Sequence, residues 1–528
     1  MIKLSIKWTG LLAVLILLAG CHKDLDRFPP NDVTSEQLYK NEQGYRSVLA
    51  KVYGSMALTG NSGPAGAGDV AGIDEGTSDF LRLYWKAQEL STDEAVVAWN
   101  DPGIQDFHNM NWSPNNPMLI GLYSRCFYVI TLCNEFIRES SVEKLNSRGI
   151  SGTSADNIKR MNAEARFVRA YQYSVLMDLF ANPGFVNEET PIGAAVRPEQ
   201  IKRADLFNYI EGQLKTLETE LPSPKANEYG RADQAAVWAL LARNYLNAQV
   251  FTGTAKWTEA ITYSKKVIGA GYALISDYRN LMLADNNISN TEAIWTLNYD
   301  GIRTQNYGGT TFIVNASVGG TMDQTVSGLT AWGGTRTTKN LPNLFPDYTG
   351  AADKRAQFYQ QNLEIEKISE FKDGFAVTKF RNRTKSGGFG SDPGKTFSDI
   401  DFPVFRLAEQ YLIYIEAVLR GGTGGDAATA LNYANALRTR AYLNTSGNIS
   451  SVSLTLDYVI NERARELYWE GFRRTDLVRF DKFTESSYLW PWKGGVKNGT
   501  GVDAFRRIYP IPATEVGSNP NIKQNPNY

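Results

Sequence analysis

Histidine is nearly absent from this chain, with two residues, His22 and His108, among 528. Catalysis by a nucleophile and a base would therefore have to use His108, because His22 lies in a polar stretch near the N-terminus. Neither Cys126 nor Cys133 stands in a recognisable catalytic motif. The sequence thus argues against a Ser-His-Asp or Cys-His hydrolase, and equally against a histidine-rich metal site.

An excess of charge of either sign is also missing. The chain has 55 Lys and Arg residues against 56 Asp and Glu residues, and its formal net charge is -1. A nucleic-acid-binding protein would show a basic excess or a basic stripe. With 42% hydrophobic and 21% charged residues, the composition is that of an ordinary globular protein. We therefore expect no nucleic-acid partner.

Long hydrophobic runs are scarce, and the clearest lies at residues 11–19, after two lysines. This run is too short to cross a bilayer and has the length of a signal-peptide core. It ends in Leu-Ala-Gly before Cys21, which resembles the lipobox of bacterial lipoproteins. We predict that residues 1–20 are a cleaved signal peptide, that Cys21 is lipidated, and that residues 21–34 form a tether. The alternative is an ordinary signal peptide with an incidental cysteine.

Cysteine is too scarce for a disulfide-supported fold, because only Cys126 and Cys133 remain beside the predicted lipidated Cys21. Seven residues on a helix separate them by roughly 10 Å of rise. A disulfide needs Cα atoms within about 7 Å. We expect two buried free thiols.

Helical periodicity, by contrast, is abundant and falls into two parts of the chain. The segments predicted as helices are 35–56, 117–140, 156–180, 204–220, 232–249 and 257–270, followed by 406–419, 427–442 and 454–470. The antiparallel helix pairs and their small residues indicate a tetratricopeptide-like scaffold, although no strict 34-residue period is present.

The sequence between the two helical parts is glycine-rich, with β-type pieces at 293–299, 310–314 and 375–380. The fold class predicted is mainly α, with a helical-pair scaffold carrying an irregular, loop-rich and partly β region. We expect one domain over residues 35–528: scaffold at about 35–270 and 404–480, irregular region at about 272–403, and a C-terminal coil at 481–528.

Residues 74–112 differ from the helical segments because they show no sustained helical period. They contain Trp85, Trp99 and Trp112, and Trp99 is followed by the turn formers Asn-Asp-Pro-Gly at 100–103. An aromatic ring beside amide and carboxylate groups suits a sugar, whose C–H face is apolar and whose hydroxyls need hydrogen-bond partners. Taken alone, each tryptophan is better explained as a core residue, because tryptophan is highly buried on average.

Glu462, Glu466 and Glu470 are spaced one helical turn apart and are the best candidates for carboxylate catalysis. Glycosidase carboxylates must flank a bond from two sides, whereas these would project in parallel. With Arg463, Arg465, Arg473 and Arg474 among them, they indicate a structural ion-pair network. A helical glycosidase is therefore the weaker hypothesis.

Several motifs together resemble the SusD/RagB family of outer-membrane lipoproteins of Bacteroidetes, over essentially the whole chain. The motifs are the lipobox at Cys21, AEARFVRA at 163–170, FRLAE at 405–409, ERAREL with EGFRRTDL at 462–477, and YPIP with QNP at 509–526. The starch-binding members look most similar, through DEG at 74–76, Arg82, EL and TDE at 89–94, NYGG at 306–309, and YLW with WKGG at 488–495.

This resemblance implies a tetratricopeptide-like fold, a glycan-binding face without catalysis, and a partner, a SusC-like TonB-dependent β-barrel transporter. In the starch-binding members an aromatic arc holds the glucan helix. Matched to this chain, its rings are Trp99, Tyr307 and Trp332, with Arg82 and Asp74 as polar partners. Asn100 or Asp101 stands where the family has an asparagine after the first tryptophan. Some relatives bind a structural calcium, whose ligands this sequence does not assign; no other cofactor is expected.

The resulting prediction is an outer-membrane lipoprotein, lipid-anchored and facing the cell exterior, that captures starch-like α-glucan and passes it to the transporter. Three alternatives stay open: a relative that binds another glycan, a helical glycosidase, and a tetratricopeptide-type scaffold that binds proteins only.

Overall fold

The computed structural model describes residues 35–66, 68–193, 197–359 and 362–528. The predicted signal peptide at 1–20, the predicted lipidation site Cys21 and the predicted tether at 21–34 all lie outside these residues. No helix in the described part of the chain combines the length and the apolar character needed to cross a membrane.

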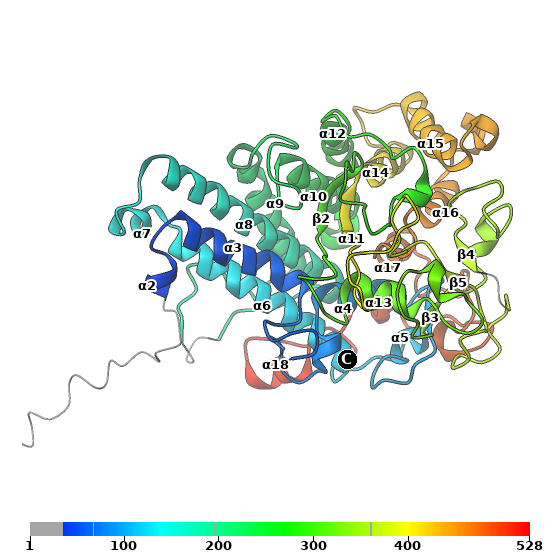
Figure 1. Ribbon diagram of the computed structural model, residues 1–528, viewed down its shortest axis with the longest axis horizontal. Helices are drawn as coiled ribbons and strands as arrows, with labels where there is room; N and C mark the ends of the chain where they lie inside the picture. Colours follow the sequence, from blue (N-terminus) through cyan, green and yellow to red (C-terminus); the bar gives the residue numbers. More distant parts are fainter. Residues whose placement is uncertain (1–34, 67, 194–196, 360–361) are drawn as a thin grey trace, which may run out of the picture.

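Helices that pack on one another in succession run through the molecule, from α3 at one end to α15 and α16 at the other (Figure 1). The main helices are α3 (Glu42–Ala57), α6 (Pro117–Glu139), α8 (Gly152–Phe180), α9 (Arg203–Glu220), α10 (Gln234–Leu246), α12 (Trp257–Ile268), α14 (Leu407–Leu419), α15 (Ala427–Tyr442) and α16 (Leu456–Leu467). The shorter ones include α2 (Ser35–Leu38), α5 (Asp106–Asn109), α7 (Val142–Ser147), α11 (Ala248–Thr252), α17 (Arg473–Arg479) and α18 (Ala513–Ser518).

The sequence sets the ends of these helices through capping residues. Asn116 begins α6, where its side chain accepts hydrogen bonds from the backbone N–H groups of Met118 and Leu119, and proline follows it at the first helical position. Asp233 caps α10 in the same way. The alanines of α10 are fully buried, and their small side chains let α9, α12 and α14 approach closely. The helices pack in pairs along the chain, and the predicted fold class, mainly α, is confirmed.

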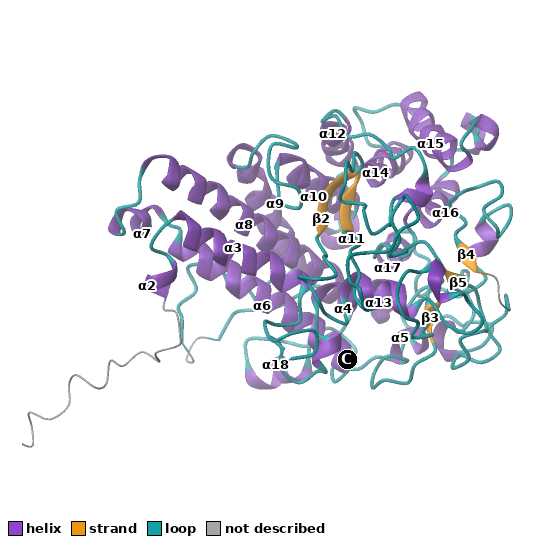
Figure 2. Ribbon diagram, in the orientation of Figure 1, coloured by secondary structure: helices purple, strands orange, loops and turns teal. Residues whose placement is uncertain are grey.

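Three two-stranded antiparallel sheets lie in or beside the irregular region, at the right of Figure 2 and in its centre. They pair β1 (Val96–Val97) with β3 (Thr335–Arg336), β2 (Ala293–Leu297) with β6 (Phe402–Arg406), and β4 (Phe358–Tyr359) with β5 (Ala376–Val377). Because β6 runs directly into α14, the β2–β6 pair ties the irregular region to the helical scaffold.

Two segments fold differently from their sequence patterns. Residues 310–314, predicted as β-type, belong to the helix α13 (Gly309–Ala316), whose residues are all buried. Residues 80–89, placed in a stretch without helical period, form the helix α4 (Phe80–Glu89), again with every residue buried. Both helices are short, with ten and eight residues, and both are buried on all sides, so their structure is decided by packing against the rest of the chain, which overrides weak local propensity.

The predicted helix 35–56 is likewise interrupted, between α2 and α3. The predicted helix 454–470 ends at Leu467, because Trp469 has a φ of 65°. Glu470 therefore lies beyond the helix and does not share its face with Glu462 and Glu466. Cys126 and Cys133 are buried free thiols, as predicted.

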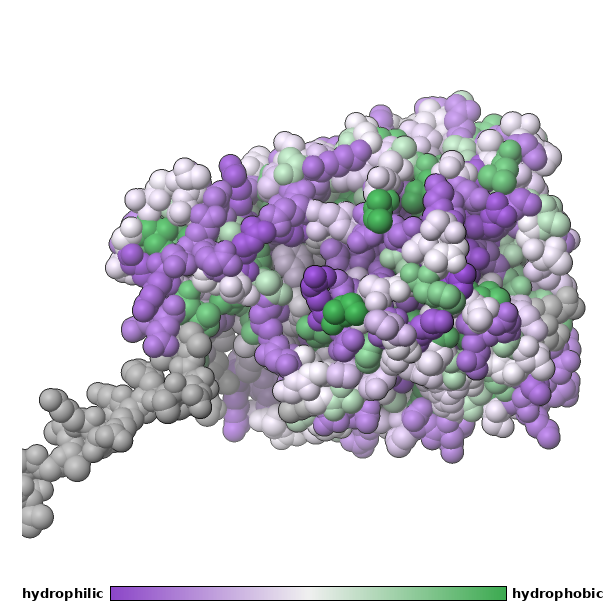
Figure 3. Space-filling view, in the orientation of Figure 1, coloured by the Kyte–Doolittle hydropathy of each residue, from purple (hydrophilic) through white to green (hydrophobic). Residues whose placement is uncertain are grey.

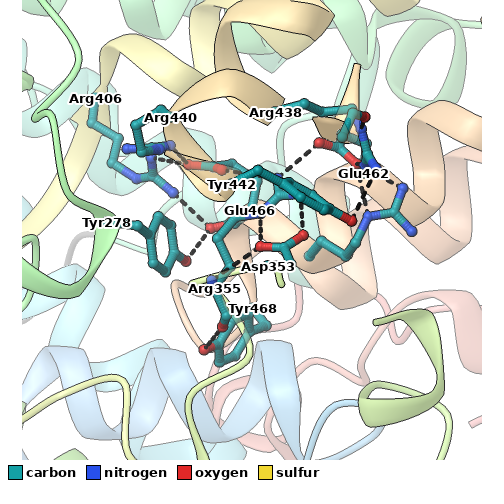
Figure 4. Close-up of polar contacts among 12 residues, drawn as sticks. Tyr278, Asp353, Arg355, Arg406, Arg438, Arg440, Tyr442, Glu462, Glu466 and Tyr468 are labelled. Atoms are coloured by element: carbon teal, nitrogen blue, oxygen red, sulfur yellow. Dashed lines mark hydrogen bonds and ion pairs between the residues drawn. The ribbon is translucent and has the colours of Figure 1, made fainter. Parts of the chain in front are cut away.

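A buried ion-pair network connects α16 with the end of β6, with α15 and with the loop at 353–355 (Figure 4). Glu466 accepts hydrogen bonds from Arg355, Arg406 and Arg440, and Glu462 from Arg355, Arg438 and Arg465. Glu470 pairs with Arg406 and Lys379. The predicted ion-pair role of the three glutamates is confirmed.

The arginine partners of these glutamates are mostly different from those expected. Arg465 does pair with Glu462, but Arg463 pairs with Asp476 and Arg473 with Asp93. The side chain of Arg474 donates instead to the backbone carbonyl of Arg507. The other basic partners of the three glutamates come from segments far apart in the sequence, so the spacing of charges within one helix could not identify them.

Candidate functional site

Trp99, Tyr307 and Trp332 lie next to one another, although they come from three separate segments. The ring centroids of Trp99 and Trp332 are 6.4 Å apart with the planes inclined at 44°, and those of Trp332 and Tyr307 are 6.2 Å apart at 58°. All three side chains are partly exposed. Since each ring is tilted against the next, the three form a curved platform at the surface, which we call the aromatic arc.

The β1–β3 pair holds Trp99 in the aromatic arc. The N–H of Ala98 donates to the carbonyl of Gly334 at 2.8 Å, which continues the pairing beyond β1 toward Trp99. The indole then packs against Gly334 itself, since a Cβ added there would lie 2.3 Å from ring atom Cζ2 of Trp99. Glycine at 334 is thus required for the ring to lie against the backbone.

The end of α13 holds Trp332. Its N–H donates to the carbonyl of Asn315 at 2.9 Å, and the next N–H, of Gly333, donates to the carbonyl of Val318 at 2.8 Å. The side chain of Thr330 also donates to the side-chain oxygen of Asn315 at 3.0 Å. The segment that carries Trp332 is therefore fixed to a buried helix on its inner side.

Arg82, on α4, fixes the backbone at Tyr307. Its Nη1 donates to the carbonyl of Tyr307 at 2.8 Å and to that of Gly76 at 3.0 Å. The guanidinium lies 4.6 Å from the ring centroid of Phe312 and 5.9 Å from that of Trp99. Arg82 thus contacts two of the three segments of the arc from below.

Arg82 is more enclosed than a surface ligand-binding side chain, with 7% of its area exposed. Burial lowers the pKa of its guanidinium to about 10, against the opposing influence of Asp79, Asp101 and Asp74. The side chain is therefore charged at neutral pH. Much of its hydrogen-bonding capacity serves the protein backbone.

The other predicted polar residues surround the arc at the surface. Asp74, Asn100 and Asp101 are all exposed. Asp74 lies beside Gly76, where a Cβ would be 3.2 Å from its Oδ1 and 3.6 Å from Cβ of Tyr307. Asn100 and Asp101 follow Trp99 directly in the turn that leads to α5. The predicted site residues thus come together, with Arg82 below the rings and the other polar groups at their edges.

Further residues support the arc that sequence reasoning did not identify. Phe312 contacts Trp99 at 6.1 Å between ring centroids, and Phe397 contacts Tyr307 at 5.5 Å. Asp79 accepts a hydrogen bond from the N–H of Gly309, just after Tyr307, and burial raises the pKa of its carboxyl. The only indication of such support within one short stretch of sequence is the pair Gly333-Gly334 directly after Trp332. The contacts of Phe312, Phe397 and Asp79 join segments that are far apart in the sequence.

The remaining tryptophans of residues 74–112 are core residues. Trp85 donates its indole N–H to the carbonyl of Trp469, and Trp112 donates to the hydroxyl of Tyr528. Both side chains are fully buried. His108 is also buried, which lowers its pKa to about 4. Trp85 and Trp112 are therefore core residues, whereas Trp99 lies at the surface.

The described residues contain no accessible arrangement of catalytic carboxylates at Glu462 and Glu466, since both are fully buried and paired with arginine. Nor does this part of the chain hold a group of three or more His, Cys, Asp and Glu side chains placed to bind a metal ion. The structural calcium therefore stays an unassigned prediction.

A helical scaffold that presents a curved aromatic platform defines a binding protein. Comparison with curated proteins shows 33% identity to the starch-binding protein SusD of Bacteroides thetaiotaomicron, covering 98% of each chain. SusD-like protein P2 of Formosa agariphila is 23% identical, again over 98% of each chain. Residues 353–528 also match the SusD family. The chain belongs to the SusD family.

Solved structures of the same family share the fold. A SusD homologue from Bacteroides thetaiotaomicron has a TM-score of 0.73 at 18% identity, covering 94% of this chain and 99% of its own. A surface glycan-binding protein A from the same species, in complex with laminarihexaose, has a TM-score of 0.69 at 20% identity, covering 92% and 99%. Members of the SusD family are carbohydrate-binding proteins without catalytic activity, which confirms the prediction that the chain is not an enzyme.

Proposed function

We propose that this protein binds a starch-like α-glucan at the aromatic arc and delivers it to a SusC-like TonB-dependent transporter of the outer membrane. The observation that supports the binding role most strongly is the arc itself: Trp99, Trp332 and Tyr307 form one tilted series of rings at the surface. The curated relative named as a starch-binding protein supports the choice of glycan.

The tilt of the rings is what suits a helical glucan. A flat ring stacks on one or two sugar units, and a chain that curves needs each further ring to be inclined against the last. Successive inclinations of 44° and 58° provide this curvature. A flat β-linked chain would be served better by coplanar rings.

Polar groups around the rings would bind the sugar hydroxyls. Asp74 and Asp101 offer carboxylate oxygens as acceptors, and Asn100 offers both a donor and an acceptor. Arg82 lies below the rings with Nη1 committed to two backbone carbonyls, so its role toward a glycan would be through Nη2. Binding by stacking plus exposed hydrogen bonds would be weak for each contact, because water competes at the surface.

Location and delivery follow from the predicted anchor. Acylation at Cys21 would hold the protein on the outer membrane, where a transporter on the same surface receives the glycan at high effective concentration. Hydrophobic residues on the face shown in Figure 3 occur in small groups among hydrophilic ones, without one large apolar patch. A contact with the transporter through this face would therefore be largely polar.

The glycan is tested with affinity electrophoresis in native gels that contain amylopectin, levan, xylan or laminarin. We expect retardation by amylopectin alone, with a protein that binds no polysaccharide as the mobility standard. Retardation by another of the four polymers and not by amylopectin would identify a SusD-family binder of a different glycan. No retardation in any gel would contradict the proposal.

A further inference from the structure

A pocket lies between α3, the end of β2 and the loop at 228–231, close in the chain to the aromatic arc. Its volume is about 300 Å³, at the lower end of the range of roughly 300–1,000 Å³ for small-molecule sites. We call it the α3–β2 pocket. Its floor is apolar and buried, formed by Leu49, Ala57 and Leu297.

The rim of this pocket carries an exposed aromatic ring and polar groups. Tyr229 is 44% exposed, although its hydroxyl end interacts with Thr296 and Asp401. The ring is thus held at its inner end and open on its side. Residues 228–231 also line a neighbouring cavity of about 340 Å³, so Tyr229 stands between two hollows.

The charged side chains of the pocket are all paired, and Arg231 donates to both oxygens of Glu164. Arg46 on α3 donates to both oxygens of Glu228, at 2.8 and 2.7 Å, and both side chains are exposed. Asn298 is exposed beside them. A free cation or a free carboxylate would favour a charged ligand, whereas a closed ion pair and an amide favour a neutral ligand that carries hydroxyl groups.

The pocket is physically connected to the arc. Thr304 lines the pocket, and Tyr307 follows three residues later, so their Cα atoms lie within roughly 10 Å. Buried Asn306 joins the two: its Nδ2 donates to the carbonyl of Ala57 at 2.7 Å, and its Oδ1 accepts from the N–H of Gly308 at 2.6 Å. Ala57 lies in the pocket floor and Gly308 follows the arc residue Tyr307.

From these contacts we propose that the α3–β2 pocket is a second carbohydrate subsite, which takes a neutral sugar unit of the glucan chain bound at the aromatic arc. The apolar floor and the Tyr229 ring match the C–H face of a sugar, and the Arg46–Glu228 pair with Asn298 matches its hydroxyls. This inference depends on the proposed function, because the arc supplies the rest of the chain.

Gly54 gives a direct way to close the pocket. It lines the pocket within α3, and a Cβ added there meets only the end of the Leu58 side chain, at 4.0 Å. Gly54→Leu therefore fills the hollow without displacing backbone, and leucine favours the helix. Gly212→Leu is the matched control, because Gly212 is an exposed glycine of α9 with nothing within 4 Å of an added Cβ.

The test is calorimetric titration with maltotriose and maltoheptaose, a short and a long probe. The unmodified protein and Gly212→Leu should bind maltoheptaose more tightly than maltotriose. Gly54→Leu should bind maltotriose as they do and lose about 3- to 10-fold in affinity for maltoheptaose, the range expected for one stacked sugar. Tyr229→Ala should show the same selective loss, and Tyr229→Phe should not.

The outcomes separate the two proposals. If the unmodified protein binds neither probe while the fold is intact, the proposed function fails and the subsite with it. If it binds both and Gly54→Leu and Tyr229→Ala retain the full preference for maltoheptaose, the arc stands and the subsite is refuted.

Discussion

At the scale of single residues, the aromatic arc depends on small side chains as much as on its rings. Trp99 can lie in place because Gly334 has no Cβ, and Tyr307 is followed by Gly308, where a Cβ would lie 1.6 Å from Oδ2 of Asp79. These glycines are positioning residues, since they bind nothing themselves. A change at them should alter ligand affinity through the rings.

We predict that Gly334→Ala weakens binding of α-glucan by about tenfold, because the new methyl group displaces the Trp99 indole and one stacking contact is lost. Calorimetric titration with maltoheptaose measures the effect. Gly212→Ala, at an open and exposed helix position, is the control and should bind normally. Unchanged affinity in Gly334→Ala would mean that Trp99 does not contact the glucan.

At the scale of elements, the buried ion-pair network holds the end of β6, α15 and α16 to the loop at 353–355 (Figure 4). Glu466 is fully buried and accepts from three arginines. Removing the charge of Glu466 leaves the positive charges of those arginines without a negative partner in the interior. The loss of folding free energy is far larger than for a surface ion pair.

Glu466→Gln should therefore lower the free energy of unfolding by about 3–5 kcal/mol, the usual cost of breaking a buried pair. Denaturant unfolding followed by circular dichroism measures it. The exposed Glu143→Gln on α7 should change stability by less than about 0.5 kcal/mol. Equal stability of the two variants would show that the network does not stabilise the fold.

The same network predicts a loss of stability in acid. Arginine neighbours lower the pKa of Glu462 from 4.5 to about 2 and hold that of Glu466 still lower. A carboxyl with a depressed folded pKa contributes stability above its unfolded pKa, and this contribution disappears as the pH falls toward the folded value. Melting temperatures should fall between about pH 5 and pH 2, and less steeply in Glu466→Gln. A parallel decline in both proteins would contradict this.

The long helices were predictable from the sequence, and two short, fully enclosed ones were not. The helix α15 has the predicted bounds, 427–442, because its apolar residues follow the helical period. The helices α4 and α13 have only ten and eight residues and are buried on every side, so packing against distant segments decides their structure. The three rings of the arc were predicted from the family resemblance. Their supporting residues Phe312 and Phe397 could not be predicted, since their contacts with the rings join segments that are far apart in the sequence.

At the scale of the whole molecule, capture and delivery of a glycan require the protein to stay at the cell surface. We predict that Cys21→Ala moves the protein from the membrane fraction into the soluble fraction, because acyl chains contribute about 0.8 kcal/mol per buried CH₂. Fractionation of cells that lack the transporter measures this without contribution from the partner. Recovery of the variant in outer membranes of those cells would contradict lipid anchoring at Cys21.

Delivery requires a partner in the same membrane. We predict that the acylated protein co-purifies with a large β-barrel protein after extraction in mild detergent, since two weakly interacting proteins on one surface meet at high effective concentration. Cys21→Ala, produced at the same level, is the control and should recover less of the partner. Isolation of the acylated protein alone in several detergents would argue against delivery to a transporter.

The most direct test of the central claim is glucan binding by the triple variant Trp99→Ala, Tyr307→Ala, Trp332→Ala, measured together with its melting temperature. Losing three stacking contacts should cost on the order of 2–4 kcal/mol, enough to abolish retardation by amylopectin. The melting temperature should change little, because all three rings are partly exposed. A folded triple variant that still binds amylopectin like the unmodified protein would contradict the account.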